Sequence, residues 1–177
     1  DQLAQSVFLE MFGDPWKNRK QFPLLKLSEI VKENKIITYG IVQAGPHINN
    51  GVPYIKSGDI KNGTIDANSL LKTSKKIASS YERSKCNVGD IIISIRATVG
   101  SIAFLPKELD GANLTQGTAR ISPNEEVINP IYLYHCLKSH GIQTKIKQQT
   151  KGVTFKEITL GKLRNIKIPV PNMNLQK

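Results

Sequence analysis

The amino-acid sequence predicts an α+β fold: a mixed, twisted β-sheet domain, with helices packed toward its C-terminal part and a helical segment at its N-terminus. Between about residues 38 and 122, Gly, Asn and Asp separate short apolar stretches, in the way that turns separate strands. Helical patterns return after Asn129, and a further helical pattern occupies residues 2–12. These three observations favour strands and helices in separate parts of the chain, rather than in regular alternation.

The N-terminal segment, residues 2–12, is expected to be a helix because Leu3, Val7 and Met11 recur at helical spacing. It should stop at residues 13–15, where Pro15 prevents continuation. Because the pattern is already under way at the first residue, we expect the end of a longer helix whose apolar stripe packs against a partner helix. The alternative is a short helix that folds back onto its own domain and leaves the chain monomeric.

Six segments have the composition of strands. They are residues 38–42, 52–56, 91–95, 101–105, 118–122 and 164–170. The run Ile91-Ile92-Ile93-Ser94-Ile95 is the strongest, because it is β-branched and too continuous for a half-exposed strand. We therefore expect it at the centre of a sheet.

Three helices are expected in the C-terminal part. Asn129 can cap a helix whose first turn holds Pro130, and this helix is expected to run to a terminating Gly141. Residues 142–150 form a second, basic helical stretch. The order Thr154-Phe155-Lys156-Glu157 has capping-box spacing and predicts the start of a short helix.

The length of 177 residues suits one main globular body with a core of its own. No apolar run is long enough to cross a bilayer, and no signal-peptide pattern stands at the start, so a cytoplasmic protein with no membrane contact is expected. Cys86 and Cys136 lie far apart in the sequence. We interpret them as ordinary reduced thiols.

The charge is the first observation that bears on function. A formal net charge of +11 and a pI near 9.7 favour a polyanionic partner, above all nucleic acid, because phosphate neutralisation releases counterions. The basic residues are spread along the chain, so they indicate a folded basic face instead of a disordered arm.

Motifs for several enzyme classes are missing from the sequence. It contains neither the phosphate-binding loop of nucleotide hydrolases nor the glycine pattern of dinucleotide enzymes. The three histidines lack metal-ligand spacing, and no carboxylate cluster suggests a magnesium nuclease. Asn129-Pro130-Ile131-Tyr132 is similar to the Asn-Pro-Pro-aromatic loop of adenine methyltransferases, but Ile131 replaces the second proline and no Gly-rich cofactor loop accompanies it. We interpret Asn129 as a helix cap and expect no catalytic residue and no metal site.

Several phrases, in order, resemble the specificity subunits of type I restriction-modification systems. They are Leu3-Ala4-Gln5-Ser6-Val7-Phe8-Leu9-Glu10-Met11-Phe12-Gly13-Asp14-Pro15, Gly51-Val52-Pro53-Tyr54-Ile55-Lys56-Ser57-Gly58-Asp59-Ile60, Val88-Gly89-Asp90-Ile91-Ile92-Ile93-Ser94, Lys151-Gly152-Val153-Thr154 and Ile166-Lys167-Ile168-Pro169-Val170-Pro171. Each motif alone is short and unspecific, but together, in this order, the motifs extend over nearly the whole chain.

The resemblance implies the end of a conserved-region helix over residues 1–15, a DNA target-recognition domain over residues 16–171, and the start of a following conserved helix over residues 172–177. It implies recognition of one half of a bipartite duplex DNA target. It also implies assembly with methyltransferase subunits and a motor-nuclease subunit that carry out methylation and cleavage. S-adenosylmethionine, ATP and magnesium are then expected only on those partners, with no cofactor in this chain.

Four segments combine glycine with basic or amide side chains and are candidate DNA-contacting loops, namely residues 39–45, 56–61, 96–100 and 151–156. The candidate DNA-binding residues are Tyr39, Gln43, Lys56, Ser57, Lys61, Arg96, Thr98, Gln116, Lys151, Gly152, Thr154 and Lys156. Arg96 is the expected base reader, because it follows a buried strand and arginine can bind guanine through two hydrogen bonds. Lys151 and Gly152 are expected at a helix start that binds a phosphate.

Two other functions remain open from the sequence. One is an unrelated basic module that binds RNA or single strands, which the low aromatic fraction of 6% disfavours. The other is a non-catalytic protein-interaction scaffold. In this second case the charge serves solubility alone. Separately, for the DNA-recognition hypothesis, an exposed stripe of Leu3, Val7 and Met11 is expected to pair two copies of the chain, which places two recognition faces on one particle.

Overall fold

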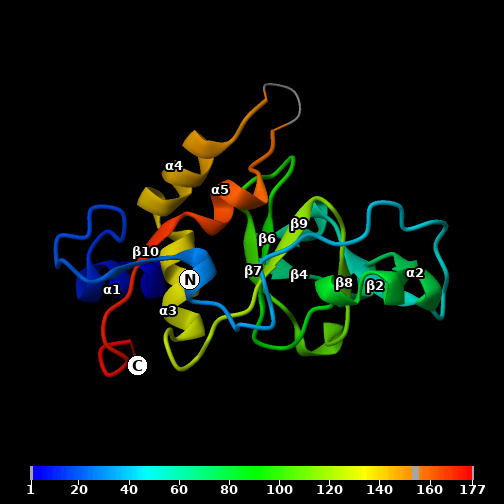
Figure 1. Cartoon of the computed structure of the whole chain (residues 1–177), viewed down its shortest axis with the longest axis horizontal. Helices are drawn as coiled ribbons and strands as arrows, with labels where there is room; N and C mark the ends of the chain where they lie inside the picture. Colours follow the sequence, from blue (N-terminus) through cyan, green and yellow to red (C-terminus); the bar gives the residue numbers. More distant parts are fainter. Residues whose placement is uncertain (1, 153–155, 177) are drawn as a thin grey trace.

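The computed structural model describes residues 2–152 and 156–176, and it confirms the α+β class. Three helices, α1 (Gln2–Phe12), α3 (Pro130–Lys138) and α4 (His140–Gln149), lie toward one end of the elongated molecule, as Figure 1 shows. The strands β2 (Val52–Ile55) and β8 (Asn113–Leu114) and the short helix α2 (Lys75–Ser80) lie toward the other end. Every helix within the described residues is too short or too polar to cross a bilayer.

The middle of the molecule is an antiparallel sheet of β6 (Ile91–Ser94) between β7 (Ile102–Phe104) and β9 (Thr118–Ile121). In its register Ile91 pairs with Ile121 and Ser94 pairs with Thr118. All four residues of β6 are buried. The strongest strand prediction, with its central position, is therefore confirmed.

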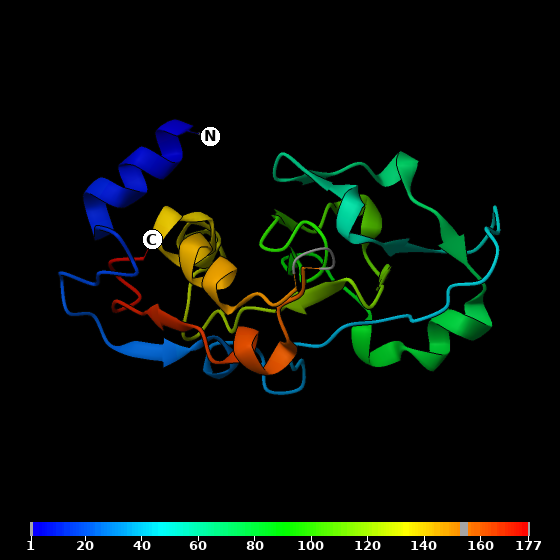
Figure 2. The same ribbon diagram turned by 90° about the horizontal axis from the view of Figure 1, so that it is seen from above.

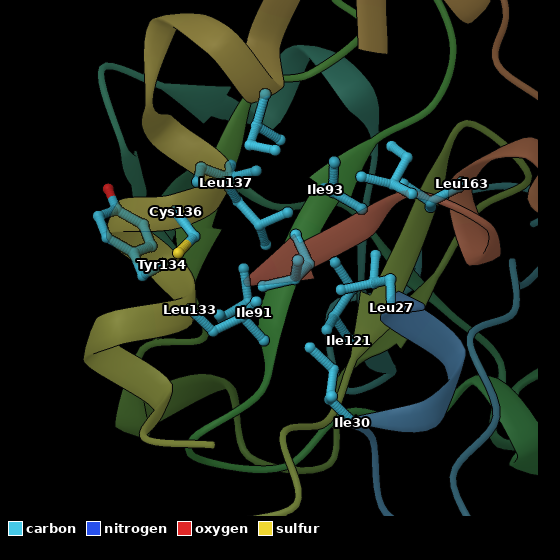
Figure 3. Close-up of a cluster of buried hydrophobic side chains, with 14 of the residues drawn as sticks. Leu27, Ile30, Ile91, Ile93, Ile121, Leu133, Tyr134, Cys136, Leu137 and Leu163 are labelled. Atoms are coloured by element: carbon cyan, nitrogen blue, oxygen red, sulfur yellow. The ribbon is translucent and has the colours of Figure 1, made fainter. Parts of the chain in front are cut away.

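Two hydrophobic cores flank this sheet, and β6 contributes to both. Ile91 and Ile93 belong to the larger core, together with Leu133 and Leu137 of α3, as Figure 3 shows. Ile92 belongs to the smaller core, which lies on the side of β2 and β8. Because side chains alternate across a strand, a continuous isoleucine run supplies both faces. The end of this sheet is thereby held rigidly.

The remaining strands form three small sheets among the described residues. β1 (Leu24–Lys26) pairs antiparallel with β10 (Lys167–Pro169), which brings the two halves of the chain together. β2 (Val52–Ile55) pairs antiparallel with β5 (Lys72–Thr73) and parallel with β8 (Asn113–Leu114), so this sheet is mixed. β3 (Ile60–Lys61) and β4 (Thr64–Ile65) form a hairpin.

Polar side chains start four of the helices by accepting hydrogen bonds from unpaired backbone amides. Ser74 caps α2, Asn129 caps α3, Ser139 caps α4, and Thr159 caps α5 (Leu160–Arg164). Short 3-10 turns add η1 (Leu27–Glu29), η2 (Ser57–Asp59), η3 (Ala67–Ser69), η4 (Glu82–Ser84) and η5 (Lys107–Leu109). The prediction of an Asn129 cap followed by Pro130 is confirmed.

Several predicted boundaries are wrong. Residues 38–42 make two isolated bridges, at Tyr39 and Ile41, instead of a strand. Gly141 does not terminate a helix, because α3 ends at Lys138 and Ser139 caps a new helix that contains Gly141. Residues 164–170 are divided between the end of α5 and β10.

The capping box was predicted to start a helix at residues 154–157. Thr154 lies outside the described residues, but Glu157 is in extended backbone that pairs with Arg96 and Lys151. Helix α5 begins only at Leu160, after the Thr159 cap. This prediction is therefore wrong within the described residues.

Helix α1 packs on α3 through one face. Phe8 is buried, and its ring lies 5.5 Å from that of Tyr132 and 5.6 Å from that of His135. The side of α1 that carries Leu3, Val7 and Met11 stays exposed, and Figure 2 shows α1 at the outer edge of the molecule. Leu3 is 77% exposed, and Val7 and Met11 are also exposed. The helix thus folds back on its own domain and still presents the apolar stripe to solvent.

The C-terminal residues 172–176 form hydrogen-bonded turns. Gln176 is buried, and its side-chain oxygen accepts a hydrogen bond from the backbone amide of Asn129 at 2.8 Å. The C-terminal segment is therefore attached to the start of α3. The further conserved helix expected from residue 172 stays a prediction.

Both cysteines are free and buried. Burial raises the pKa of the Cys86 thiol and of the Cys136 thiol well above the ordinary value. Because the thiolate is the reactive form, both side chains are inert packing residues in the folded chain.

The contact between α1 and α3 is expected to weaken in mild acid. Burial lowers the pKa of His135, and the positive charge of Lys138 lowers it further, so folding favours the neutral ring. The stability that this ring contributes is present above its ordinary pKa of about 6.5 and is lost as the pH falls through the lowered value. As the pH falls below about 6.5, the melting temperature of the parent should therefore fall more steeply than that of His135→Gln, whose side chain cannot titrate. Parallel pH profiles would contradict this expectation.

Candidate nucleic-acid interface

Arg96 follows the rigid end of the central sheet. The amide of Ile95 donates to the carbonyl of Gly117 at 2.9 Å, and the amide of Arg96 approaches the same oxygen at 3.3 Å. One residue further, the amide of Ala97 donates to the carbonyl of Lys156 at 3.0 Å. The loop after β6 and the segment between α4 and α5 therefore lie side by side, as Figure 1 shows near the end of β6.

A second set of contacts brings the η2 turn to the same place. The hydroxyl of Ser57 donates to the carbonyl of Gly117 at 2.8 Å, and the hydroxyl of Thr98 approaches the carbonyl of Ser57 at 3.2 Å. The side chains of Ser57 and Thr98 are thus used within the fold, where they attach neighbouring loops to one another. Lys56 lies beside them, half-buried, with its ammonium group 3.9 Å from Asp59.

Glu157 joins the two loops. Its amide and carbonyl pair with Lys151 at 2.9 and 2.8 Å, and its carboxylate accepts a hydrogen bond from Nη2 of Arg96 at 3.1 Å. Both side chains of this ion pair are about two-fifths exposed. The pair therefore stands at the surface, between the predicted loops.

A hollow of about 380 Å³ opens next to the ion pair. Two lysines and several hydroxyl groups share its lining with small residues, namely Ala97, Thr98, Val99, Ser101, Lys147, Thr150, Gly152 and Lys156. Ammonium and hydroxyl donors of this kind suit the oxygens of a phosphodiester backbone. We refer to this hollow, Arg96 and Glu157 together as the loop face.

Of the other predicted residues, Gln116 lies closest to the loop face, since it precedes Gly117. Its amide donates to the carbonyl of Ile41, which brings the exposed side chains of Tyr39 and Gln43 along the same edge. Lys61 is exposed in the β3–β4 hairpin, whose turn approaches α3, because a Cβ on Gly63 would meet the Tyr134 hydroxyl at 2.9 Å. The hairpin that carries Lys61 therefore lies close to α3.

Glycine was expected in the candidate DNA-contacting loops because it lets a ligand approach the backbone closely, and this reason needs correction. A Cβ on Gly40 would lie 2.2 Å from the carbonyl oxygen of Leu114, and one on Gly100 would lie 2.5 Å from the side-chain oxygen of Gln143. These glycines allow close packing within the fold, so they are no sign of close approach by a ligand. Gly58 differs from them, since a Cβ there meets nothing within 4 Å.

The physical basis predicted for Lys151 and Gly152 is also wrong. No described helix begins at these residues, because Lys151 pairs with Glu157 in extended backbone and Gly152 has a φ of +91°. Lys151 is exposed beside the loop face and keeps its full charge as a reason to meet phosphate.

Sequence reasoning missed three participants, namely Lys147, Thr150 and Glu157. Lys147 and Thr150 occur in the basic helical stretch that was predicted, and their position relative to residues 97–101 could not be inferred from spacing. Glu157 was read as a helix cap. Among the described residues, no group of three or more His, Cys, Asp or Glu side chains is arranged to hold a metal ion.

Comparison with known proteins gives a family-model match and several similar curated sequences. The family model described as type I restriction modification DNA specificity domain matches residues 17–177. The chain is 35% identical over 150 residues to the type I restriction enzyme EcoBI specificity subunit of Escherichia coli, covering 85% of this chain and 31% of that protein. It is 33% identical over 127 residues to the putative type I restriction enzyme MjaX specificity subunit of Methanocaldococcus jannaschii, covering 72% and 27%. The chain thus spans about a third of the length of these curated relatives.

Solved structures share the fold. The HsdS subunit from Thermoanaerobacter tengcongensis is similar with a TM-score of 0.67 at 20% identity, covering 99% of this chain and 40% of that one. The type I restriction-modification S subunit from M. genitalium gives a TM-score of 0.58 at 14% identity, covering 87% and 36%. At these identities the likeness concerns the fold.

Proposed function

The chain belongs to the type I restriction-modification DNA specificity family, and on that premise we propose that it recognises one half of a bipartite sequence in double-stranded DNA. Residues 16–171 form the recognition domain in this proposal. The observation that carries it is the convergence of Arg96, Thr98, Lys151 and Lys156 at one end of the central sheet.

The proposed division of labour is chemical. Lys147, Lys151 and Lys156 neutralise backbone phosphates, whereas Arg96, on a rigid support, reads a base edge. The chain contributes no catalytic group and acts in the cytoplasm. Methyltransferase subunits and a motor-nuclease subunit bind S-adenosylmethionine, ATP and magnesium, and carry out methylation and cleavage at the sites that the chain selects.

Salt dependence tests this proposal through Lys151. Each phosphate contact contributes about 0.9 to the slope of log K against log salt. Lys151→Ala should therefore weaken every duplex alike and flatten that slope by about one unit in fluorescence anisotropy titrations.

The matched control is Lys32→Ala. The amide of Lys32 donates to the carbonyl of Ser122, at the end of β9 opposite Thr118, and its side chain pairs with Glu125. This variant should keep the parental slope. Equal slopes for all three proteins would remove Lys151 from the interface, and absence of salt-sensitive duplex binding by the parent would reject the proposed function.

We further propose that the exposed face of α1 is a docking surface for a partner helix. Beside α1 lies a groove of about 230 Å³ whose lining is mostly apolar and includes Val7, Met11 and Ile131. Covering such side chains contributes roughly 1.5–3 kcal/mol for each one fully buried. In the assembly a partner helix fills the groove, and without that helix the stripe pairs two copies of the chain.

Self-association is therefore expected for the isolated chain. Light scattering across a concentration series should show dimers for the parent and monomers for Leu3→Glu/Val7→Glu. The variant should keep the melting temperature that the parent has at concentrations low enough for it to be monomeric, because both side chains are exposed in the single chain. A parent that stays monomeric at all concentrations would count against the stripe as a docking surface.

A further inference from the structure

The guanidinium group of Arg96 is held in one orientation. Its Nη2 donates to Glu157, while its Nε is buried and has no hydrogen-bond partner among the described residues. Arginine carries five N–H donors in a planar fork. The ion pair uses one of them and the surrounding atoms enclose another, so the outer end of the fork still has donors to offer. A side chain held in this way loses little further freedom when it meets a base.

Glu157 itself is fixed by the backbone. It pairs with Lys151 on one side and Arg96 on the other, and the next amide, that of Ile158, donates to the carbonyl of Ile95 at 3.0 Å. Its carboxylate is consequently attached to the same rigid strand end as Arg96. Glu157 and Arg96 are therefore linked twice, by a backbone bridge and by a side-chain ion pair.

The negative charge of Glu157 is unfavourable for the binding of DNA at this position. The chain has 25 basic and 14 acidic residues, and Lys151 and Lys156 adjoin this acid in the loop face. A carboxylate in such a place repels a polyanion and lowers affinity for every duplex. The carboxylate nevertheless accepts a hydrogen bond from Arg96, and it can thereby orient the guanidinium group.

We propose that Glu157 is a positioning residue for sequence reading: it orients Arg96 toward a base edge and gives up general affinity for discrimination. The inference rests on the proposed function, because it requires that the loop face meet duplex DNA. The proposal can be distinguished from the alternative that Arg96 contacts phosphate. In that alternative, removal of Glu157 would tighten binding to all duplexes by the same factor, so the ratio of their affinities would not change.

The test uses duplexes that the chain itself selects from a pool with a randomised segment. Affinities for a selected duplex and for a scrambled duplex of the same composition are measured for the parent and its variants. Glu157→Ala should bind the scrambled duplex more tightly than the parent. Its ratio of selected to scrambled affinity should fall about fivefold or more, the loss expected when a bidentate base contact is degraded.

Two further variants isolate the contact. Glu157→Gln removes the charge but keeps an oxygen that can accept from Nη2, so it should gain affinity for the scrambled duplex and retain most of the ratio. Because it is nearly isosteric, it also guards against a folding defect in the alanine variant. Glu125→Ala removes an exposed acid near the opposite end of the sheet and should leave the ratio unchanged.

The outcomes are distinguishable. If the parent selects no sequence, the proposed function fails. If the parent selects a sequence but Glu157→Ala keeps the parental ratio, the function stands and the positioning role is overturned. The role is equally overturned if Glu157→Ala lowers the ratio as much in an Arg96→Ala background as in the parent, or if Glu157→Gln loses as much as Glu157→Ala.

Discussion

Replacing Ile93 by alanine is expected to lower the free energy of unfolding by about 2–5 kcal/mol, the range for truncating a buried isoleucine. Ile93 is fully buried at the centre of β6, where it pairs with Ala119 and Ile102. Its side chain lies in the larger core, in the region where α3 covers the sheet (Figure 3). Truncation leaves a cavity that these packed elements can close only in part.

Urea denaturation followed by circular dichroism gives the measurement, with linear extrapolation to zero denaturant. Val88→Ala is the matched control, because Val88 is 54% exposed and its truncation should change stability by less than about 0.5 kcal/mol. Similar losses in the two variants would contradict the central position of β6. Binding to duplex DNA should be retained by Ile93→Ala at temperatures where it remains folded, since the side chain lies inside the core.

The features predicted correctly are those whose causes are local. The run from Ile91 to Ile95 is buried on both faces, so it requires no partner to be identified before its central place can be inferred. Asn129 caps α3 through bonds to amides two and three residues away. A signal of this kind is contained within one helical turn and can be read from the sequence.

The features that were missed depend on distant partners. β8 is only two residues long, and it exists because Asn113 and Leu114 pair with β2. β1 exists because it pairs with β10, which comes from the opposite end of the chain. Nothing in a short window of sequence indicates such pairing, and a segment of two or three residues has no periodicity to detect.

At the loop face, Glu157 also shows that contacts with distant residues can outweigh a local sequence pattern. Its spacing from Thr154 predicts a helix start, but residues 156–158 bond to Arg96, Lys151 and their neighbours instead. Long-range backbone pairing therefore overrides a local capping pattern. Arg96 could be predicted as a candidate because it follows a buried strand, whereas the acid that contacts it could be identified only from the fold.

The face that meets DNA depends on this packing as much as on its basic residues. Ser57, Thr98 and Gly117 are used to hold three loops together, so their polar groups are largely taken up inside the fold. The side chains left to contact a ligand are mainly cationic. On such a face, general affinity comes from many lysines, while discrimination has to come from the few groups that are held rigidly.

Arg96→Ala is accordingly expected to have the largest effect on recognition. It should weaken binding to a selected duplex by about 1–3 kcal/mol, roughly 5- to 150-fold, and should weaken binding to a scrambled duplex much less. Two hydrogen bonds to one base edge are lost in the first case, and one cationic charge in the second. The measurement is a pair of anisotropy titrations at one fixed salt concentration, because affinities at different salt concentrations are not comparable.

Arg96→Lys refines this prediction. Lysine keeps the charge but cannot reproduce the planar fork, so it should bind the scrambled duplex as the parent does and lose discrimination nearly as fully as alanine. If Arg96→Ala lowers both affinities by the same factor, Arg96 contacts phosphate and the base reader lies elsewhere on the loop face. If Arg96→Lys retains full discrimination, an ammonium group can read the base as well, and the planar fork of arginine is not required at this position.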